Sequence, residues 1–258
     1  MGILNVTPDS FSDGGRWLNK AGAIQHALAM QASGADIIDI GGESTRPGAQ
    51  AVELQQELDR VMPVIEAIVP QLSVPVSIDT SKPGVMREAV RAGAGMINDV
   101  CALRQLEAMQ AVAELAVPVC LMHMPGDPRV MQNNPVYENV TGDIKHFLLE
   151  RAKDCENNGI LPKNILLDPG FGFGKTFQQN LELFHGLSDL VASGYPILVG
   201  LSRKAMIGEI TGRKMPARMP GSIVSAVLAA QMGAAIIRVH DVAETCDALK
   251  VAASLRPA

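Results

Sequence analysis

Short apolar segments recur along the chain, and each ends in residues that can form hydrogen bonds. The segments are rich in Val, Ile and Leu and show no clean alternation of apolar and polar positions. Continuous apolar runs of this length are typical of strands with two buried faces, as in a parallel sheet. The pattern predicts strands at residues 2–6, 36–41, 74–79, 96–100, 117–123, 164–168, 197–200 and 235–239.

Between these segments, apolar residues repeat at the spacing of an amphipathic helix. The repeats predict helices at residues 21–31, 54–69, 83–92, 106–115, 144–155, 180–191, 223–231 and 243–255. Several of these helices are followed by a glycine shortly before the next strand, where a residue in the left-handed conformation commonly ends a helix. The glycines are Gly34, Gly93, Gly159, Gly194 and Gly233.

The alternation of strand and helix repeats eight times without a linker or a shift in composition. We therefore predict a single α/β domain over residues 1–258, folded as a (β/α)8 TIM barrel. In such a barrel the active site lies at the C-terminal ends of the strands. A doubly wound open sheet would give the same alternation and stays open as an alternative. The eight units and their polar strand ends favour closure.

The composition narrows the class of protein. The net charge is -5 and the sequence pI is about 5.6, which argues against nucleic-acid binding because that function needs a basic surface. No apolar run approaches the length of a membrane span, and no signal peptide is visible. The 4 cysteines form no C-x-x-C pair and are expected to be reduced and buried. We expect a soluble, cytoplasmic protein that binds neither nucleic acid nor membrane.

A phosphate site is indicated after the second predicted strand, in the sequence GGESTRPG at residues 41–48. The two glycines would let backbone N–H groups approach an anion. Thr45 adds a hydroxyl and Arg46 a guanidinium fork that suits phosphate. The loop after the first strand, NVTPDSFSDGG, consists of ordinary turn-forming residues, so by itself it fits either a site or a plain connection.

Two carboxylates and an amide end three of the apolar strands, namely Asp79, Asn98 and Asp168. A carboxylate at such a position is unfavourable unless it is paired. Each could cap the following helix or pair with a nearby Lys or Arg, and Asp79 in particular could supply a cap. Three such ends around one barrel mouth suit a heterocycle that carries N–H donors and a carbonyl, such as the guanidine-like edge of a pterin.

Further candidates follow the last three strands. The sequence FGFGK contains Phe173, which could line a flat aromatic pocket or pack beneath its own loop. Ser202 and Lys204 follow the seventh strand, and Arg238-Val239-His240 ends the eighth, where barrels often bind phosphate. No nucleophile elbow, P-loop or H-E-x-x-H sequence is present. The site is therefore expected to bind, orient and neutralise its ligands rather than to form a covalent intermediate.

Together these segments resemble the signature blocks of the dihydropteroate synthase family of folate biosynthesis. The blocks occur in order over the whole chain: MGILNVTPDSFSDGG, GGESTRPGA, VSIDTSKP, INDV, MHM, LLDPGFGFGK, LSRKAMIG and IIRVHDV. The resemblance implies a transferase that condenses 6-hydroxymethyl-7,8-dihydropterin diphosphate with 4-aminobenzoate to give 7,8-dihydropteroate and pyrophosphate. It also implies a sulfonamide target that uses Mg2+ and forms a homodimer through outer helices, with residues 223–231 and 243–255 as contributors.

The resemblance implies a role for each matching residue. The pterin would be held by Asp79, Asn98, Asp168 and Lys204. The diphosphate would be held by Thr45, Arg46, Arg238 and His240, with Val239 between the last two also among the substrate-binding residues. The 4-aminobenzoate would be framed by Phe11, Pro47, Phe173 and Ser202. Asn5 would bind Mg2+, and the residues expected to act in catalysis are Asp79, Asp168, Lys204, Arg238 and His240.

The chemistry implied for these residues is a dissociative displacement, in which diphosphate leaves an electron-rich pterin before the neutral arylamine attacks. Cationic groups and Mg2+ would neutralise the leaving charge, and the two carboxylates would stabilise the pterin cation. Two other functions stay open: a corrinoid-dependent methyltransferase with the same pterin-holding acids, and a pterin- or sulfonamide-binding module without turnover.

One departure from the family concerns the start of the chain. Family members usually carry a short segment before the first strand that closes the lower end of the barrel, whereas this chain begins at Met1, inside the predicted strand. The resemblance therefore leads us to expect exposed apolar surface at the lower end and a less securely placed Asn5.

Overall fold

The computed structural model describes residues 1–7, 16–44, 50–126 and 136–255. Each of the strands predicted above is found, and each lies within its predicted range. The strands are β1 (Gly2–Asn5), β2 (Ile38–Gly41), β3 (Val76–Asp79), β4 (Met96–Asp99), β5 (Val119–Met122), β6 (Ile165–Asp168), β7 (Leu198–Val199) and β8 (Ile236–Ile237).

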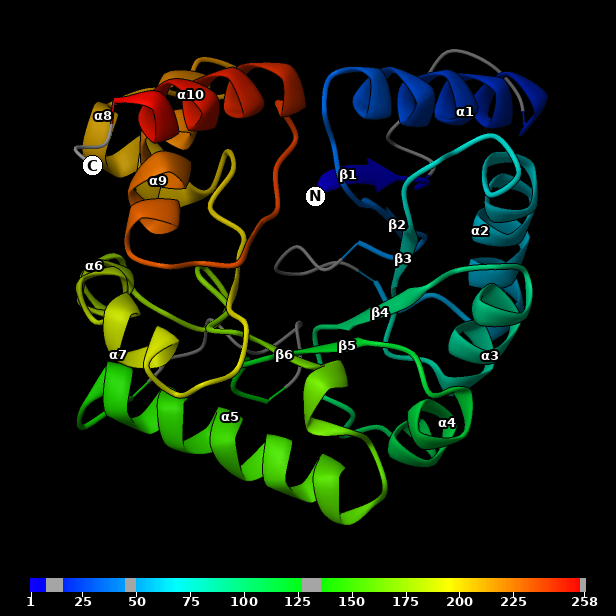
Figure 1. Cartoon of the computed structure of the whole chain (residues 1–258), viewed down its shortest axis with the longest axis horizontal. Helices are drawn as coiled ribbons and strands as arrows, with labels where there is room; N and C mark the ends of the chain where they lie inside the picture. Colours follow the sequence, from blue (N-terminus) through cyan, green and yellow to red (C-terminus); the bar gives the residue numbers. More distant parts are fainter. Residues whose placement is uncertain (8–15, 45–49, 127–135, 256–258) are drawn as a thin grey trace.

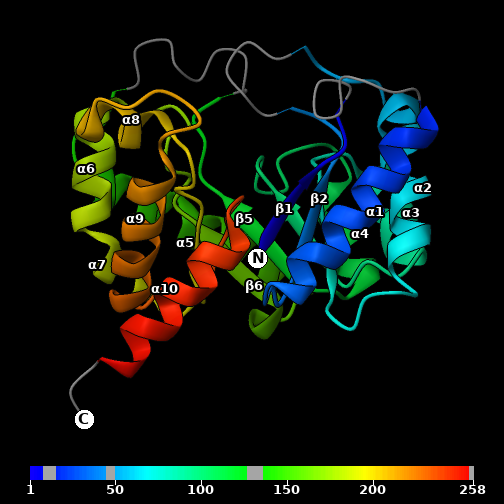
Figure 2. The same ribbon diagram turned by 90° about the horizontal axis from the view of Figure 1, so that it is seen from above.

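The strands close into a barrel. β1 to β6 pair in sequence order, β7 pairs with β8, and every pairing is parallel. The two sheets are joined by parallel bridges between Leu167 and Ile197 and between Gly2 and Val239. Helices surround the strands on all sides (Figure 1), and a view turned by 90° shows β1 and β2 running side by side (Figure 2). The closed barrel confirms the predicted fold class and excludes the doubly wound open sheet.

Helices connect the strands around the outside. They are α1 (Arg16–Ala32), α2 (Leu54–Ile68), α3 (Pro83–Arg91), α4 (Ala108–Leu115), α5 (Val140–Asn157), the short 3-10 helix η2 (Pro162–Asn164), α6 (Phe177–His185), α7 (Leu187–Val191), α8 (Ala205–Thr211), α9 (Met219–Gln231) and α10 (Val242–Ser254). The five glycines predicted to end helices all have positive φ, between 89° and 104°. Their predicted role is confirmed, because this conformation is strained for other residues.

Several helices, such as α1, α5 and α9, begin a few residues before their predicted ranges, and three other features differ from the prediction. Residues 180–191 form parts of two helices, α6 and α7, which meet at Gly186, where a side chain would overlap Thr141. The short helix α8 was not predicted, because its seven residues are too few to show a periodic pattern. α4 begins at Ala108 rather than at 106, because Glu107 takes a left-handed conformation with φ of 65°.

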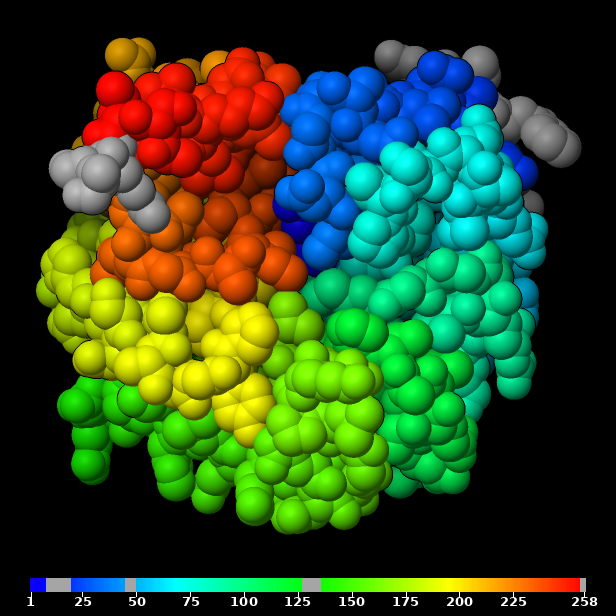
Figure 3. Space-filling model, in the orientation of Figure 1, coloured from blue at the N-terminus to red at the C-terminus, as the bar shows by residue number. Residues whose placement is uncertain are grey.

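Side chains alternate between the barrel interior and the layer beneath the helices. Ile38, Ile40 and Ile78, for example, belong to the large core between strands and helices. The lower barrel interior is filled by Met96, Cys120, Leu166 and Leu198, with the half-buried Met1, Ile37 and Ile236 packed against them. Figure 3 shows the first residues of the chain at the centre of this face, between α10 and α1. Apolar residues thus fill the lower barrel, and polar residues are left for the upper end.

Two further expectations concern the burial of the cysteines and the absence of a membrane span. Cys101, Cys120 and Cys155 are buried free thiols, as predicted, whereas Cys246 is only half-buried. Among the described helices, none combines the length and the apolar character needed to span a bilayer.

Candidate active site

The polar residues that end the strands converge at the upper mouth of the barrel, as the sequence predicts. Asn5, Asp79, Asn98, Asp168 and Arg238 stand at or just after the C-terminal ends of β1, β3, β4, β6 and β8. Four other predicted substrate residues lie outside the described part of the chain, namely Phe11, Thr45, Arg46 and Pro47. The mouth is therefore built here from the residues that the structure places.

Arg238 is the centre of a buried ion cluster. Its Nε donates to Asp39 Oδ2 at 2.6 Å, and one of its terminal nitrogens donates to Asp79 Oδ2 at 2.7 Å. Burial disfavours the charged guanidinium, but Asp39 and Asp79 raise the pKa of Arg238 above its ordinary value. Burial raises the pKa of Asp79 to about 7, although Arg238 acts in the opposite direction. Asp79 is thus a carboxylate that titrates near neutral pH beside a permanent cation.

Asp39 was not assigned a role from the sequence, yet it organises the cluster. Its side chain is fully buried, and the oxygen that accepts from Arg238 also accepts from Asn98 Nδ2 at 3.2 Å. Its other carboxylate oxygen is buried without a hydrogen-bond partner among the described residues. A carboxylate in the middle of the apolar run IIDIG is costly unless it is paired, and that signal could have identified Asp39.

Asp168 and Lys204 are two further charged residues at the mouth, and each influences the pKa of the other. Burial raises the pKa of Asp168, while the charge of Lys204 opposes that shift. Burial lowers the pKa of Lys204 to about 8. The Lys204 ammonium donates to the Phe171 carbonyl and lies 4.6 Å from the centre of the Phe173 ring. Such a contact is an attractive cation–π interaction.

Phe173 forms an apolar wall together with residues from neighbouring strands. It is half-buried and packs against Val100, Cys101, Met122 and Met124. Its loop contains Gly170 with φ of 68°, and a side chain at that position would overlap the carbonyl oxygen of His123. Close packing of backbone on backbone therefore fixes the loop that carries Phe173.

Lys175 is a second buried cation, held in an unusual way. Its ammonium donates to the carbonyls of Gly170 at 2.8 Å and Phe173 at 2.9 Å, and lies 3.1 Å from His123 Nδ1. Burial lowers the pKa of Lys175 to about 7. It also lowers the pKa of His123 to about 3, so His123 is neutral and its Nδ1 can accept from Lys175. His123 therefore supports the loop that carries Lys175.

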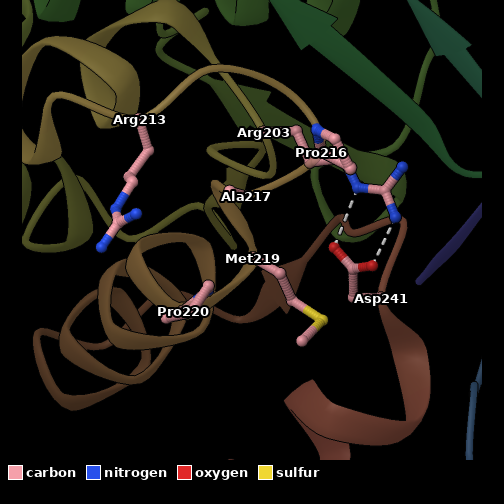
Figure 4. A pocket seen from close by; sticks show the side chains of 7 residues that line it. All are labelled: Arg203, Arg213, Pro216, Ala217, Met219, Pro220 and Asp241. Carbon is pink, nitrogen blue, oxygen red and sulfur yellow. Dashed lines mark hydrogen bonds and ion pairs between the residues drawn. The ribbon is translucent and has the colours of Figure 1, made fainter.

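Two residues that follow β7, Ser202 and Arg203, bond to different partners. The Ser202 hydroxyl lies 3.0 Å from His240 Nδ1 and accepts from the His240 backbone N–H at 3.1 Å, so it fixes the position of that ring. Arg203, by contrast, forms two hydrogen bonds with Asp241, of 2.5 and 3.0 Å. Figure 4 shows this pair at the edge of a pocket of about 530 Å3, whose other lining residues are Arg213, Pro216, Ala217, Met219 and Pro220.

Two predicted site residues differ in what they offer a ligand. Val239 is buried in the core beneath the helices, and its backbone N–H and carbonyl both bond to the first residues of the chain. The structure therefore does not bring its side chain into the mouth. Asn5 is half-exposed at the end of β1, beside Gly41 on β2.

The alternative in which Asp79 caps the next helix, α3, is not observed. The N-terminus of α3 has no side-chain cap, and Thr80 accepts from the Lys82 N–H.

The donors at the mouth can be compared with what the implied magnesium ion requires. Within the described residues, no group of three or more His, Cys, Asp or Glu side chains is arranged to hold a metal. Mg2+, however, is usually held by one or two protein oxygens, substrate phosphates and water. Asn5 fits that requirement by its chemistry, because it carries an amide oxygen and stands half-exposed at the end of β1.

Comparison with known proteins gives a consistent result. Residues 1–240 match the family model described as pterin binding enzyme. A dihydropteroate synthase of Escherichia coli is 50% identical over 251 residues, which cover 97% of this chain and 89% of that protein. Two solved synthases, each aligned over 100% of this chain, are similar in structure. One, from Xanthomonas albilineans with 4-aminobenzoic acid, has 54% identity, a TM-score of 0.94 and 93% coverage. The other, from Yersinia pestis with a sulfonamide drug complex, has 50% identity and a TM-score of 0.95, and the alignment covers 94% of that chain.

Proposed function

The chain belongs to the dihydropteroate synthase family of pterin-binding enzymes, and from this membership and its site we propose how it works. The reaction joins 4-aminobenzoate to 6-hydroxymethyl-7,8-dihydropterin diphosphate and releases pyrophosphate. The observation that carries the residue assignments is the convergence of two buried carboxylates, Asp79 and Asp168, with Arg238 and Lys204 at one mouth. This arrangement offers both acceptors for the pterin and positive charge for the diphosphate.

Pterin recognition is assigned to the carboxylates and their neighbours. A pterin edge presents N–H donors, which an ionised carboxylate accepts more strongly than a neutral group does. Asp79 and Asp168 end β3 and β6, and Asn98 on β4 is held by its bond to Asp39. Lys204 can donate to the pterin carbonyl. The two carboxylates would also stabilise positive charge that develops on the pterin.

The leaving diphosphate is assigned to the cationic side of the mouth. The bonds of Arg238 to Asp39 and of His240 to Ser202 support this assignment, and Thr45 and Arg46 are proposed to complete the set. Asn5 would supply an oxygen ligand to Mg2+, which when bound neutralises charge on the diphosphate. The catalytic residues proposed are therefore Asp79, Asp168, Lys204, Arg238 and His240.

The second substrate is assigned to the edge of the mouth near Phe173 and Ser202, with Phe11 and Pro47 proposed as further contacts. Sulfonamides would compete there. Because the arylamine is a neutral nucleophile, no strong base is required, and the buried carboxylates fit a dissociative order of events. Rates measured with a series of ring-substituted 4-aminobenzoates test this order. Insensitivity to amine basicity is expected, and a steep dependence would refute it.

The main experiment measures pyrophosphate release from the purified protein with dihydropterin diphosphate and Mg2+, with and without 4-aminobenzoate. Release that requires the arylamine and yields dihydropteroate is the expected outcome. An Asp168→Asn variant serves as the test of the site, and we expect its rate to fall at least about a hundredfold, in the range of lost electrostatic stabilisation.

Two other outcomes would change the proposal. Binding of the pterin diphosphate without pyrophosphate release, by a protein shown to be folded, would favour the binding module. Turnover that depends on a corrinoid and a methylated folate would favour the methyltransferase, although the relatives reported above are synthases.

The assembly proposed is a homodimer through α9 and α10. These helices pack against each other and expose Val224, Leu228 and Val251 at 59%, 44% and 58%. Val224 and Leu228 are four residues apart and so share a helix face. Light scattering should give twice the chain mass, and Leu228→Glu should halve it. A cytoplasmic location and a single-domain organisation stay predictions.

A further inference from the structure

Glu43 joins the two sides of the segment that follows β2. One of its carboxylate oxygens accepts from the backbone N–H of Val52 at 3.1 Å. The residues between Glu43 and Val52 include Thr45, Arg46 and Pro47, which are proposed substrate contacts. A single side chain therefore ties the point where the chain leaves the barrel to the point where it enters α2.

The other oxygen of Glu43 pairs with Lys82, which lies between β3 and α3. The Lys82 ammonium also pairs with Glu57 Oε2 at 2.6 Å, and the Glu57 side chain is fully buried on α2. Burial disfavours the charged amine, but the hydrogen bonds to Glu43 and Glu57 raise the pKa of Lys82 overall. Lys82 is thus a fixed cation, held from below by a buried carboxylate.

The backbone next to Glu43 is fixed as well. Gly42 lies against α2 so closely that a Cβ atom would stand 2.6 Å from Val61 Cγ1 and 3.1 Å from Glu57 Cγ. Its carbonyl accepts from Arg60 at 2.7 Å. The glycine is thus required for packing on α2, a role that the sequence had assigned instead to the approach of an anion.

From these contacts we propose that Glu43, held by Lys82 and Glu57, is a positioning residue for the 4-aminobenzoate and diphosphate ends of the site. The proposal rests on the proposed function. It assigns no contact with substrate to Glu43, which acts by fixing both ends of the segment that carries Thr45, Arg46 and Pro47. The pterin end is built from residues outside this segment, namely Asp79, Asn98, Asp168 and Lys204, and is expected to keep its affinity in variants of Glu43.

The test is a comparison of Glu43→Ala with Glu43→Gln. The alanine removes both contacts, whereas glutamine keeps an acceptor for the Val52 N–H and loses only the charge that faces Lys82. Both leave the buried Lys82–Glu57 pair in place, so the fold should survive. We expect Glu43→Ala to raise KM for 4-aminobenzoate and for the pterin diphosphate about tenfold, and Glu43→Gln to raise both about threefold.

A ligand that lacks the diphosphate separates positioning from general damage. The affinity of the variants for 6-hydroxymethyl-7,8-dihydropterin, measured by calorimetry, should stay within about twofold of the wild-type value. Arg91→Met is the matched control, because it removes an exposed ion pair with Glu88 whose side chains are 67% and 46% accessible. It should change neither KM nor affinity.

The outcomes are distinguishable. Unchanged KM values in Glu43→Ala would overturn the proposal, and so would a parallel fall in dihydropterin affinity, which would indicate a merely structural role. Lys82→Met should repeat the KM pattern, and Lys82→Met combined with Glu57→Gln covers the case in which the single variant does not fold. A wild-type protein without synthase activity would instead refute the proposed function.

Discussion

Two cations, the half-buried Arg238 and the buried Lys175, have opposite electrostatic surroundings. Arg238 lies between two carboxylates, Asp39 and Asp79, and its pKa is raised. Lys175 lies among backbone carbonyls and a neutral histidine, and its pKa is lowered to about 7. The negative charge of Asp168 raises the pKa of Lys175, but burial has the larger effect.

The difference shows how one site separates binding from support. Arg238 keeps its charge at every working pH and has a position set by Asp39, which suits the recognition of an anion. Lys175 uses its hydrogens to satisfy the carbonyls of the Gly170–Phe173 turn, and can do so while it loses its charge. Charge is essential at the first position, and hydrogen-bond donors are essential at the second.

Removing Arg238 should have the largest effect. Arg238→Met would leave the carboxylates of Asp39 and Asp79 buried without their cation, and breaking a buried pair in this way costs roughly 3–5 kcal/mol. Urea unfolding measures the loss. Adding Asp39→Asn to the variant should recover part of it, and a double variant no more stable than the single one would show that charge is not the cause.

A second change tests the turn that surrounds Lys175. Gly170→Ala places a methyl group against the His123 carbonyl in a left-handed conformation, so we expect a loss of about 3 kcal/mol from strain and displacement. Gly41→Ala is the matched control, because the atoms nearest to its added Cβ would be those of Asp79, at the ordinary contact distances of 3.6 to 3.8 Å. Equal losses in the two variants by urea unfolding would contradict the close packing at Gly170.

Lys175→Met should be milder than Arg238→Met. The variant leaves the carbonyls of Gly170 and Phe173 without their donor, but it leaves no charge unpaired. We expect the free energy of unfolding to fall by about 2 kcal/mol near pH 7. The pKa of Lys175 is about 7 in the folded protein and roughly 10.4 in the unfolded chain. Between these values the unfolded chain binds more protons, so the free energy of unfolding rises with pH. Lys175→Met lacks this pH-dependent contribution to the free energy of unfolding.

The stability difference between wild type and Lys175→Met should therefore grow from pH 7 to pH 9, by up to about 1.4 kcal/mol per unit. A difference that is constant with pH would mean that Lys175 stays charged in the fold.

The sequence predicted the barrel and the ends of its strands well, because buried parallel strands are apolar throughout and a polar residue at the end of one is costly unless it has a partner or a ligand. Asp79, Asn98, Asp168 and Arg238 were found in this way. Partners from distant parts of the chain were not predictable. Asp39 and Arg238 are 199 residues apart, and no local pattern links them.

Other misses have the same origin. Lys175 was visible only as the end of a glycine-rich loop, since its acceptors are backbone carbonyls that carry no side-chain signature. Lys82 and Glu57 are 25 residues apart on different elements, and each alone is an ordinary helix-region charge. Helix α8 is too short for periodicity. The local sequence pattern therefore predicted which residues lie at the mouth, whereas their hydrogen-bond and ion-pair partners depend on the three-dimensional packing.

The smallest predicted effect concerns the pH dependence of pterin binding. In the proposed site, Asp79 would accept the N–H donors of a pterin in its ionised form, and its pKa is about 7. The ionised fraction therefore falls about tenfold between pH 8 and pH 6, and the affinity for 6-hydroxymethyl-7,8-dihydropterin should fall by the same factor in calorimetric titrations, after correction for titration of the ligand. The cation Arg238 contributes no pH dependence of its own over this range.

The variant that sharpens this prediction is Asp39→Asn. The negative charge of Asp39 raises the pKa of Asp79, so its removal should move the midpoint of the binding profile to lower pH while an oxygen acceptor for Arg238 remains. Asp168 also has a raised pKa, but it is absent from the leading influences on Asp79 and should titrate alike in both proteins. An unmoved midpoint would therefore assign the pH dependence to Asp168 and not to the carboxylate that faces Arg238.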